Sequence, residues 1–103
     1  MTSDNTNGPG KNVPSIELLK ATHVFPGTYT MKAIGLREGA FVARVVAAAR
    51  EELYIDADPP YTCRESAQQA HIAITLELPV QTAEQVRDVY ERLLEIPGLL
   101  LLL

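Results

Sequence analysis

The chain has 103 residues, of which 47% are hydrophobic and 21% charged, and this length suits one folded domain. Nine basic residues stand against thirteen acidic ones, a net charge of −4, which argues against a surface that neutralises nucleic-acid phosphates. The longest apolar run, Leu99–Leu103, is far shorter than the ~20 residues that a membrane span needs. The lone cysteine forms no internal disulfide and the N-terminus resembles no signal peptide. We therefore expect a cytoplasmic protein with no nucleic-acid or membrane partner.

The chain begins with a polar segment, residues 1–14, rich in Thr, Asn, Gly and Pro. It has too little apolar surface to offset the entropy lost on ordering, and we expect a disordered tail. Residues 15–24 form a lead-in, for which the sequence leaves a short helix and a strand both open. The folded domain is expected over residues 25–103.

Two elements with clear periods come next. Over Thr28–Leu36 apolar and polar residues alternate, which predicts a half-buried strand. From Glu38 to about Leu53 apolar residues recur every three or four positions, which predicts an amphipathic helix. The prolines at 59 and 60 exclude a longer helix.

A β-hairpin is predicted from residues 61–65 and 70–79, joined by the loop Ser66–Gln69. Matching apolar with apolar positions places Cys63 opposite Ile72 and Arg64 opposite His71. In this register Cys63 points inward, and we expect it to be a small core residue.

The last part of the chain predicts a second helix and a final strand. Thr82 and Gln85 have the spacing of a capping box, and Leu99–Leu103 forms the last strand. Two pairs of opposite charge lie four residues apart on the exposed side of this helix, Arg87 with Glu91 and Asp88 with Arg92.

The order strand, helix, strand, strand, helix, strand favours an α+β ferredoxin-like plait. In this fold two helices cover one face of a four-stranded antiparallel sheet. Right-handed crossovers place the first and third strands at the centre, with the second and fourth at the edges.

The segment Phe25–Gly35 resembles the Phe-Pro, aromatic, Lys-apolar-apolar-Gly opening of the YbeD-like proteins, an uncharacterised bacterial family. Glu84–Pro97 is similar to the second helix of that family, and the resemblance covers Phe25–Leu103. It implies a plait like that of ACT regulatory domains, in a bacterial cytosol. The loop Ser66–Gln69 lacks the glycine expected from the family pattern. Because the family has no established activity, the resemblance implies no catalytic residues.

The sequence lacks the residues that three kinds of functional site on such plaits require. Arg37 fits one role in an acylphosphatase, but every Asn, the residue needed to orient water, lies within residues 1–12. The loop after the first strand has no Cys or His for a metal, and His23 and His71 are expected to be surface residues. The outward positions of the central strands hold no aromatic for RNA. There Lys32 and Glu77 predict an exposed ion pair. We expect no catalytic residue, metal or cofactor.

The loop after the first strand is the candidate effector site, formed by Gly35, Arg37, Glu38 and Gly39. ACT domains bind small effectors at this loop, and helix amides there accept a carboxylate. The other interpretation is structural, because Gly35 ends a strand and Gly39 turns the chain into a helix.

The last strand is the candidate interface, formed by Leu99, Leu100, Leu101, Leu102 and Leu103. Strand side chains alternate, so some of these leucines must point away from the core. An exposed apolar edge needs a cover, and we expect a homodimer, with residues 15–24 as the alternative cover. The sequence thus predicts a non-enzymatic regulatory or protein-interaction domain with an unidentified protein partner or small effector. The alternatives are an effector-binding domain for amino acids or carboxylates, and a plait-fold hydrolase.

Overall fold

The computed structural model describes residues 13–66 and 70–103. Its elements in chain order are α1 (Ile16–Thr22), β1 (Gly27–Leu36), α2 (Phe41–Leu53), β2 (Tyr61–Glu65), β3 (His71–Val80), α3 (Ala83–Leu93) and β4 (Leu99–Leu102). Residues 1–12, most of the predicted tail, lie outside the described residues. Val13, which was assigned to that tail, packs against the hydrophobic core.

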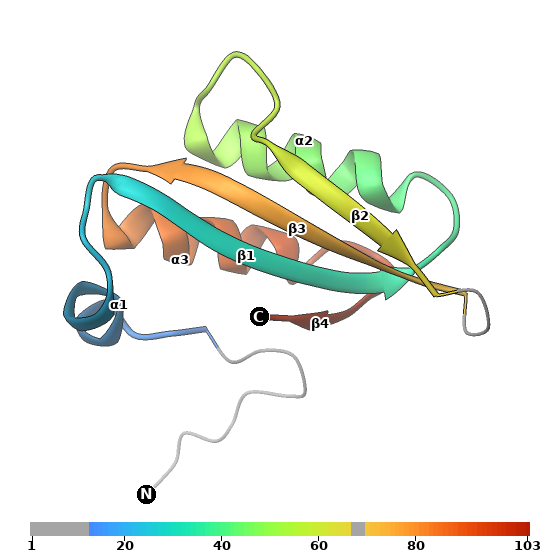
Figure 1. The fold of residues 1–103 in the computed structure, drawn as a ribbon, viewed down its shortest axis with the longest axis horizontal. Helices are drawn as coiled ribbons and strands as arrows, with labels where there is room; N and C mark the ends of the chain where they lie inside the picture. The colour runs from blue at the N-terminus through green and yellow to red at the C-terminus, as the bar shows by residue number, and fades with distance from the viewer. Residues whose placement is uncertain (1–12, 67–69) are drawn as a thin grey trace, which may run out of the picture.

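The four strands form one antiparallel sheet in the order β2-β3-β1-β4 (Figure 1). The first and third strands are central, as their order in the chain predicts. β1 and β3 pair along their whole length, from Gly27 with Val80 to Leu36 with His71. The pairing of β1 with β4 is interrupted by a bulge between Ile34 and Gly35.

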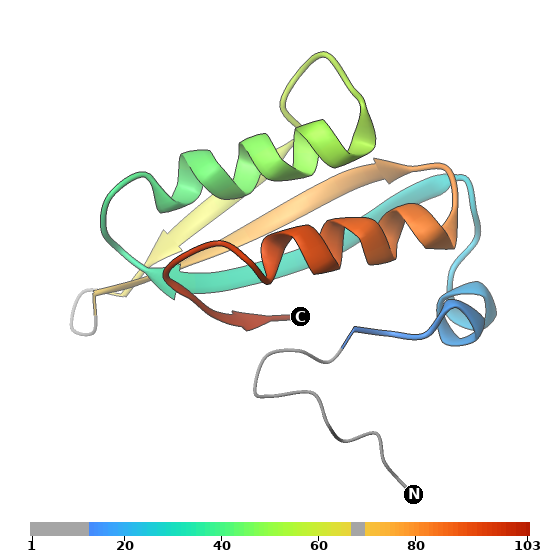
Figure 2. The ribbon, with the colours of Figure 1, turned by 180° about the vertical axis from the view of Figure 1, so that it is seen from behind.

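Helices α2 and α3 lie side by side over one face of the sheet (Figure 2). Each has an apolar stripe, because buried residues recur every three or four positions, as at Val45, Ala49 and Leu53 in α2. The core fills the space between these stripes and the inward residues of β1 and β3. No helix of the described residues covers the opposite face of the sheet, which we call the open face (Figure 1).

The lead-in forms a helix, α1, which makes three helices where two were predicted. Ser15 caps it, since its side chain accepts a hydrogen bond from the Leu18 amide at 3.0 Å. The side chain of Leu19 is buried, and α1 packs against α3. The alternative in which residues 15–24 cover the last strand is therefore wrong, because Leu100, Leu101 and Leu103 stay exposed.

The hairpin of β2 and β3 forms, but its register differs from the prediction by two residues. Cys63 lies opposite Ile74 and Arg64 opposite Ala73. Residues 67–69 of the predicted loop lie outside the described residues. A slip of two residues leaves every side chain on its predicted face, so alternation alone does not detect it.

Cys63 is exposed, which corrects the prediction of a core residue. It shares its face with the buried Ile74, its partner on β3. However, every residue of β2 is exposed, because the helices contact the two central strands and leave this edge uncovered. At a sheet edge, a side chain on the same face as the core can therefore remain exposed.

Helix α3 begins at the predicted cap, with a different partner for Gln85. The Thr82 hydroxyl accepts from the Gln85 amide at 3.2 Å, whereas Gln85 Oε1 accepts from the amide of Gln81. The predicted pair of Arg87 with Glu91 is present at 3.5 Å.

Arg92 pairs with α2 rather than with Asp88. Its guanidinium lies 2.7 Å from the Glu51 carboxylate and 3.0 Å from that of Glu52. The predicted pair within α3 is replaced by a link between the two helices.

Candidate functional site

Gly35 lies within β1, and the structure gives it a packing role. It is buried, and a Cβ placed there would overlap the ring of Phe41 at the start of α2. Glycine therefore lets the first turn of α2 approach the sheet. This contact favours the structural interpretation for one of the four residues of the candidate effector loop.

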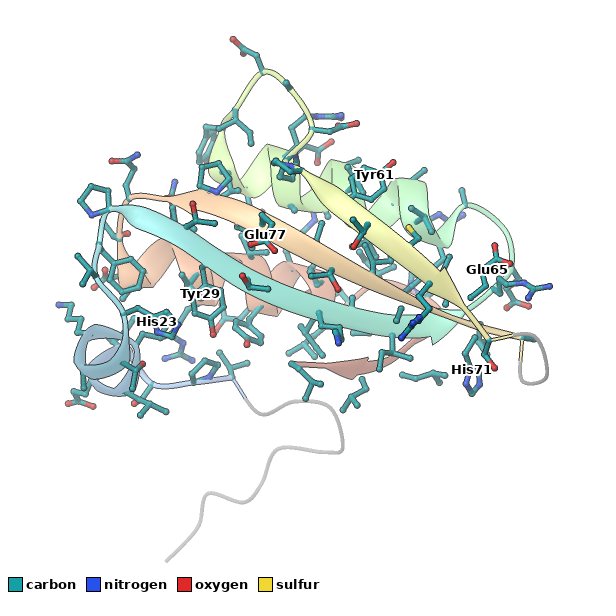
Figure 3. The ribbon with its side chains drawn as sticks, viewed as in Figure 1. His23, Tyr29, Tyr61, Glu65, His71 and Glu77 are labelled. Carbon is teal, nitrogen blue, oxygen red and sulfur yellow. The ribbon has the colours of Figure 1, made fainter. Side chains whose placement is uncertain are left out.

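Arg37 links the loop to the hairpin. Its Nη1 donates to the Ser66 carbonyl at 3.3 Å and lies 3.5 Å from the Glu65 carboxylate. Its amide donates to the Ala70 carbonyl at 2.7 Å. An incoming carboxylate would have to compete with Glu65 for this guanidinium. Figure 3 shows Glu65 at this end of the sheet, close to His71.

The remaining loop residues, Glu38 and Gly39, are exposed. Gly39 has a φ of +58°, and a Cβ there would meet no other atom within 4 Å. Beside the loop lies a hollow of about 460 Å³ that reaches the first turn of α2. Ala40, the N-cap of α2, offers no side-chain hydrogen bond to this turn. The arrangement can accept a small anion at the helix amides.

The five leucines of the candidate interface separate into two groups. Leu102 is buried at 4% exposure, and Leu99 is partly buried against the core. Leu100, Leu101 and Leu103 are 47%, 39% and 58% exposed. Leu101 lies opposite Ile34 of β1 on the open face. We call Ile34, Leu100, Leu101 and Leu103 the leucine strip.

The two histidines and the cysteine belong to three different elements of the fold. His23 ends α1, where its ring lies tilted against that of Tyr29 at a centroid distance of 4.7 Å (Figure 3). Burial raises the pKa of the Cys63 thiol, and the Glu65 carboxylate adds to this effect. Over residues 13–66 and 70–103, no group of three or more His, Cys, Asp or Glu is placed to hold a metal ion.

Behind His23, two tyrosines are joined in the core. The hydroxyls of Tyr29 and Tyr90 lie 3.3 Å apart, and both side chains are buried. Burial, together with the hydrogen bond to Tyr29, raises the pKa of Tyr90. The hydrogen bond between the two hydroxyls ties β1 to α3.

The open face holds residues whose grouping the sequence analysis missed. The predicted ion pair of Lys32 with Glu77 is wrong, because the register places Thr30 opposite Glu77 and a hydrogen bond of 2.7 Å joins them. Glu77 lies near the middle of this face (Figure 3). Lys32 instead shares a hollow with Arg64 of β2. The outward parity of both residues was readable from the sequence, but their proximity depends on the hairpin register.

The molecule is thus an α+β domain in which two of three described helices cover one face of a four-stranded antiparallel sheet. The model of a family described as a protein of unknown function, DUF493, matches residues 20–103, and the chain belongs to this family. The expected membership of an uncharacterised family is confirmed. A search of curated proteins finds no match to the chain. In the described part of the chain, no helix has the length and apolar character needed to cross a membrane.

Proposed function

We propose that this chain is a non-enzymatic protein-interaction domain that forms a homodimer through the leucine strip. We assign its fold to the ferredoxin-like plaits, close in architecture to ACT regulatory domains and YbeD-like proteins, and its setting to a bacterial cytoplasm. The element order, the central position of β1 and β3 and the two helices on one face support the fold assignment.

The observation that carries the proposal is the exposure of three leucines at the last edge strand. Leu100 and Leu101 of β4, and Leu103 directly after it, each leave 39% or more of their surface in water. Complete burial of a leucine side chain contributes ~1.5–3 kcal/mol. Six such side chains across a two-fold axis could offset an association cost of at least ~4 kcal/mol.

A second copy of the chain is the partner that best fits the strip. The strip is entirely apolar, so it has no charge pattern that would select a different partner. Two copies can place the same apolar residues against each other, and two-fold pairing is the commonest symmetry of protein dimers.

Light scattering coupled to size exclusion tests this proposal. We expect wild-type protein at tens of micromolar to be a dimer and the double variant Leu101→Lys, Leu103→Lys to be a monomer. Leu18→Lys is the matched control, since Leu18 is 54% exposed on α1 and lies outside the strip. A monomeric wild type would contradict the proposal, as would a double variant that stays dimeric.

A second candidate function is small-effector binding, favoured by the hollow of about 460 Å³ at the start of α2. A thermal-shift screen of amino acids and small carboxylates tests it. A ligand at a hundred times its dissociation constant stabilises the folded state by ~2.7 kcal/mol. Arg37→Ala should abolish such a shift and leave the dimer intact. Unchanged melting curves across the panel would remove this candidate.

The same variant, Arg37→Ala, distinguishes a plait-fold hydrolase from an interaction domain. A hydrolase that uses Arg37 would lose turnover on Arg37→Ala, whereas an interaction domain would keep its dimer. The contacts of Arg37 with Glu65 and Ser66 support a structural role for this side chain.

A further inference from the structure

The open face carries a polar hollow between β2, β3 and β1, apart from the leucine strip. Its volume is about 310 Å³, and we call it the open-face basin. Its lining comes from three strands: Lys32, Thr62, Cys63, Arg64, Ala73 and Thr75. It lies outside the candidate effector loop, so it concerns a different part of the molecule from either function considered above.

The strand register explains why the basin forms. Thr75 of β3 stands between Thr62 on one side and Lys32 on the other. In the next row Ala73 stands between Arg64 and Ile34. Opposite residues of neighbouring strands share a face, and the small side chain of Ala73 leaves the centre of its row low. The long side chains of Lys32 and Arg64 therefore lie beside the smaller alanine and threonine side chains, which form the floor of the basin.

The two cations of the basin, Lys32 and Arg64, differ in their ionic partners from most arginines elsewhere in the molecule. Ion pairs with carboxylates are formed by Arg37, Arg50, Arg87 and Arg92. Within residues 13–66 and 70–103, no ion pair includes Lys32 or Arg64. Glu77, on the same face, is bonded by Thr30 instead. Although the chain has a net charge of −4, the two cations of the basin thus have no acidic partner among the described residues.

The polar side chains that line the basin also offer more hydrogen-bond donors than acceptors. Lys32 and Arg64 are donors only, and the hydroxyls of Thr62 and Thr75 can donate as well. The lining includes no carboxylate. An oxyanion would supply the acceptors that these groups lack. A guanidinium matches two oxygens of a carboxylate or phosphate, and an ammonium adds a point charge.

We propose that the open-face basin binds a small ligand through a doubly charged oxyanion group, held between Lys32 and Arg64. Two positive charges match the charge of a phosphate monoester or of a dicarboxylate. The hydroxyls of Thr62 and Thr75 donate to the same group from the floor.

Amide NMR spectra of the uniformly labelled full chain test this site. Inorganic phosphate is titrated at constant ionic strength, with sodium chloride as the compensating salt, and succinate is titrated in a parallel series. We expect saturable shifts of the amides of Lys32, Arg64 and Thr75. Phosphate saturating more tightly than succinate assigns the site to phosphate groups, and the reverse order assigns it to dicarboxylates. Either order supports the proposal.

Matched variants separate a site from general charge attraction. Arg64→Gln and Lys32→Met should each weaken binding about tenfold, as expected for the loss of one hydrogen-bonded charge. Arg44→Gln is the control, because Arg44 is exposed on α2 and its loss changes the net charge equally. Non-saturating shifts, or equal weakening by Arg44→Gln and Arg64→Gln, would overturn the proposal. Thr75→Val gives a further check that leaves the charge unchanged, and undiminished binding by this variant would remove the floor hydroxyl from the site.

Discussion

The same strands build both faces of the sheet, but the helices bury one face and the other face contacts water. In β1 the side chains of Met31 and Ala33 are fully buried under the helices, whereas Thr30 and Lys32, their neighbours in the chain, face water. On β3, Leu76 is fully buried and Thr75 is partly exposed. The alternation of strand side chains places stability on one face and leaves the other free to make contacts.

The comparison shows why the fold says little about function. On β1 and β3 the covered face is apolar, and a core of this kind is common to many proteins with unrelated activities. Both surfaces that we assign to recognition, the leucine strip and the open-face basin, include residues of the open face. Substitutions should therefore divide by face into those that change folding and those that change binding.

The largest difference between the faces is expected at neighbouring positions of β3. Leu76→Ala removes a fully buried side chain and should lower the free energy of unfolding by about 2–5 kcal/mol. Thr75→Ala, on the open face, should change it by no more than about 0.5 kcal/mol. Urea denaturation measures both. Equal losses would show that the open face is as important for stability as the covered face.

A smaller loss is expected where β1 meets α2. Gly35→Ala should lower stability by about 1–3 kcal/mol, because the new methyl group overlaps the Phe41 ring. In the double variant with Phe41→Leu, the smaller side chain makes room, and the combined loss should be less than the sum of the single losses. Additive losses, measured by urea denaturation, would show that the overlap does not determine the need for glycine.

The cap of α3 should contribute about 1 kcal/mol to stability. Thr82→Ala removes the acceptor of the Gln85 amide hydrogen bond. Thr82→Ser keeps an acceptor hydroxyl and should restore most of the loss. Thermal unfolding followed by circular dichroism compares the three proteins, and a serine variant as unstable as the alanine variant would argue against the capping role.

The smallest effect is expected at the link between the two covering helices, and it should depend on pH. The hydrogen bond from Arg92, together with its charge, lowers the pKa of Glu51 from the model-peptide value of 4.5. A carboxyl with a lowered folded-state pKa stabilises the fold above its unfolded pKa, and this contribution is lost as pH falls through the folded value. Arg92→Gln should therefore lower the melting temperature slightly at pH 7. Below pH 4.5 the difference from wild type should shrink, and a difference independent of pH would contradict this origin.

The sequence was sufficient to predict the strand order because its signals are local. Alternation identifies β1 and β3, a period of three to four identifies α2 and α3, and the short connections limit the topology. The lead-in was ambiguous because its helix has only seven residues and depends on the burial of Leu19 against α3. Packing decides such short elements more than propensity does.

Long-range pairing could not be predicted in the same way. The face of each strand residue follows from parity, but its partner depends on the register. The pairing of β1 with β3 places Glu77 opposite Thr30 rather than Lys32, and the shift of two residues in the hairpin places Arg64 opposite Ala73. Similarly, the preference of Arg92 for Glu51 over Asp88 depends on how α2 and α3 pack. Arg37, Glu38 and Gly39 lie between β1 and α2, as expected. Gly35 instead lies within β1, and its burial under Phe41 required the structure.

The bulge between Ile34 and Gly35 has a consequence for how copies of this chain can add to one another. The two outer strands of the sheet are unlike, since β2 carries Arg64 and Glu65 while β4 is apolar and irregular. Joining β2 of one molecule to β4 of the next would generate an open filament, because every addition would expose a fresh end. Charged side chains on one border and a bulge on the other oppose such growth. The two edges of the sheet thus disfavour strand-to-strand growth, each by a different feature.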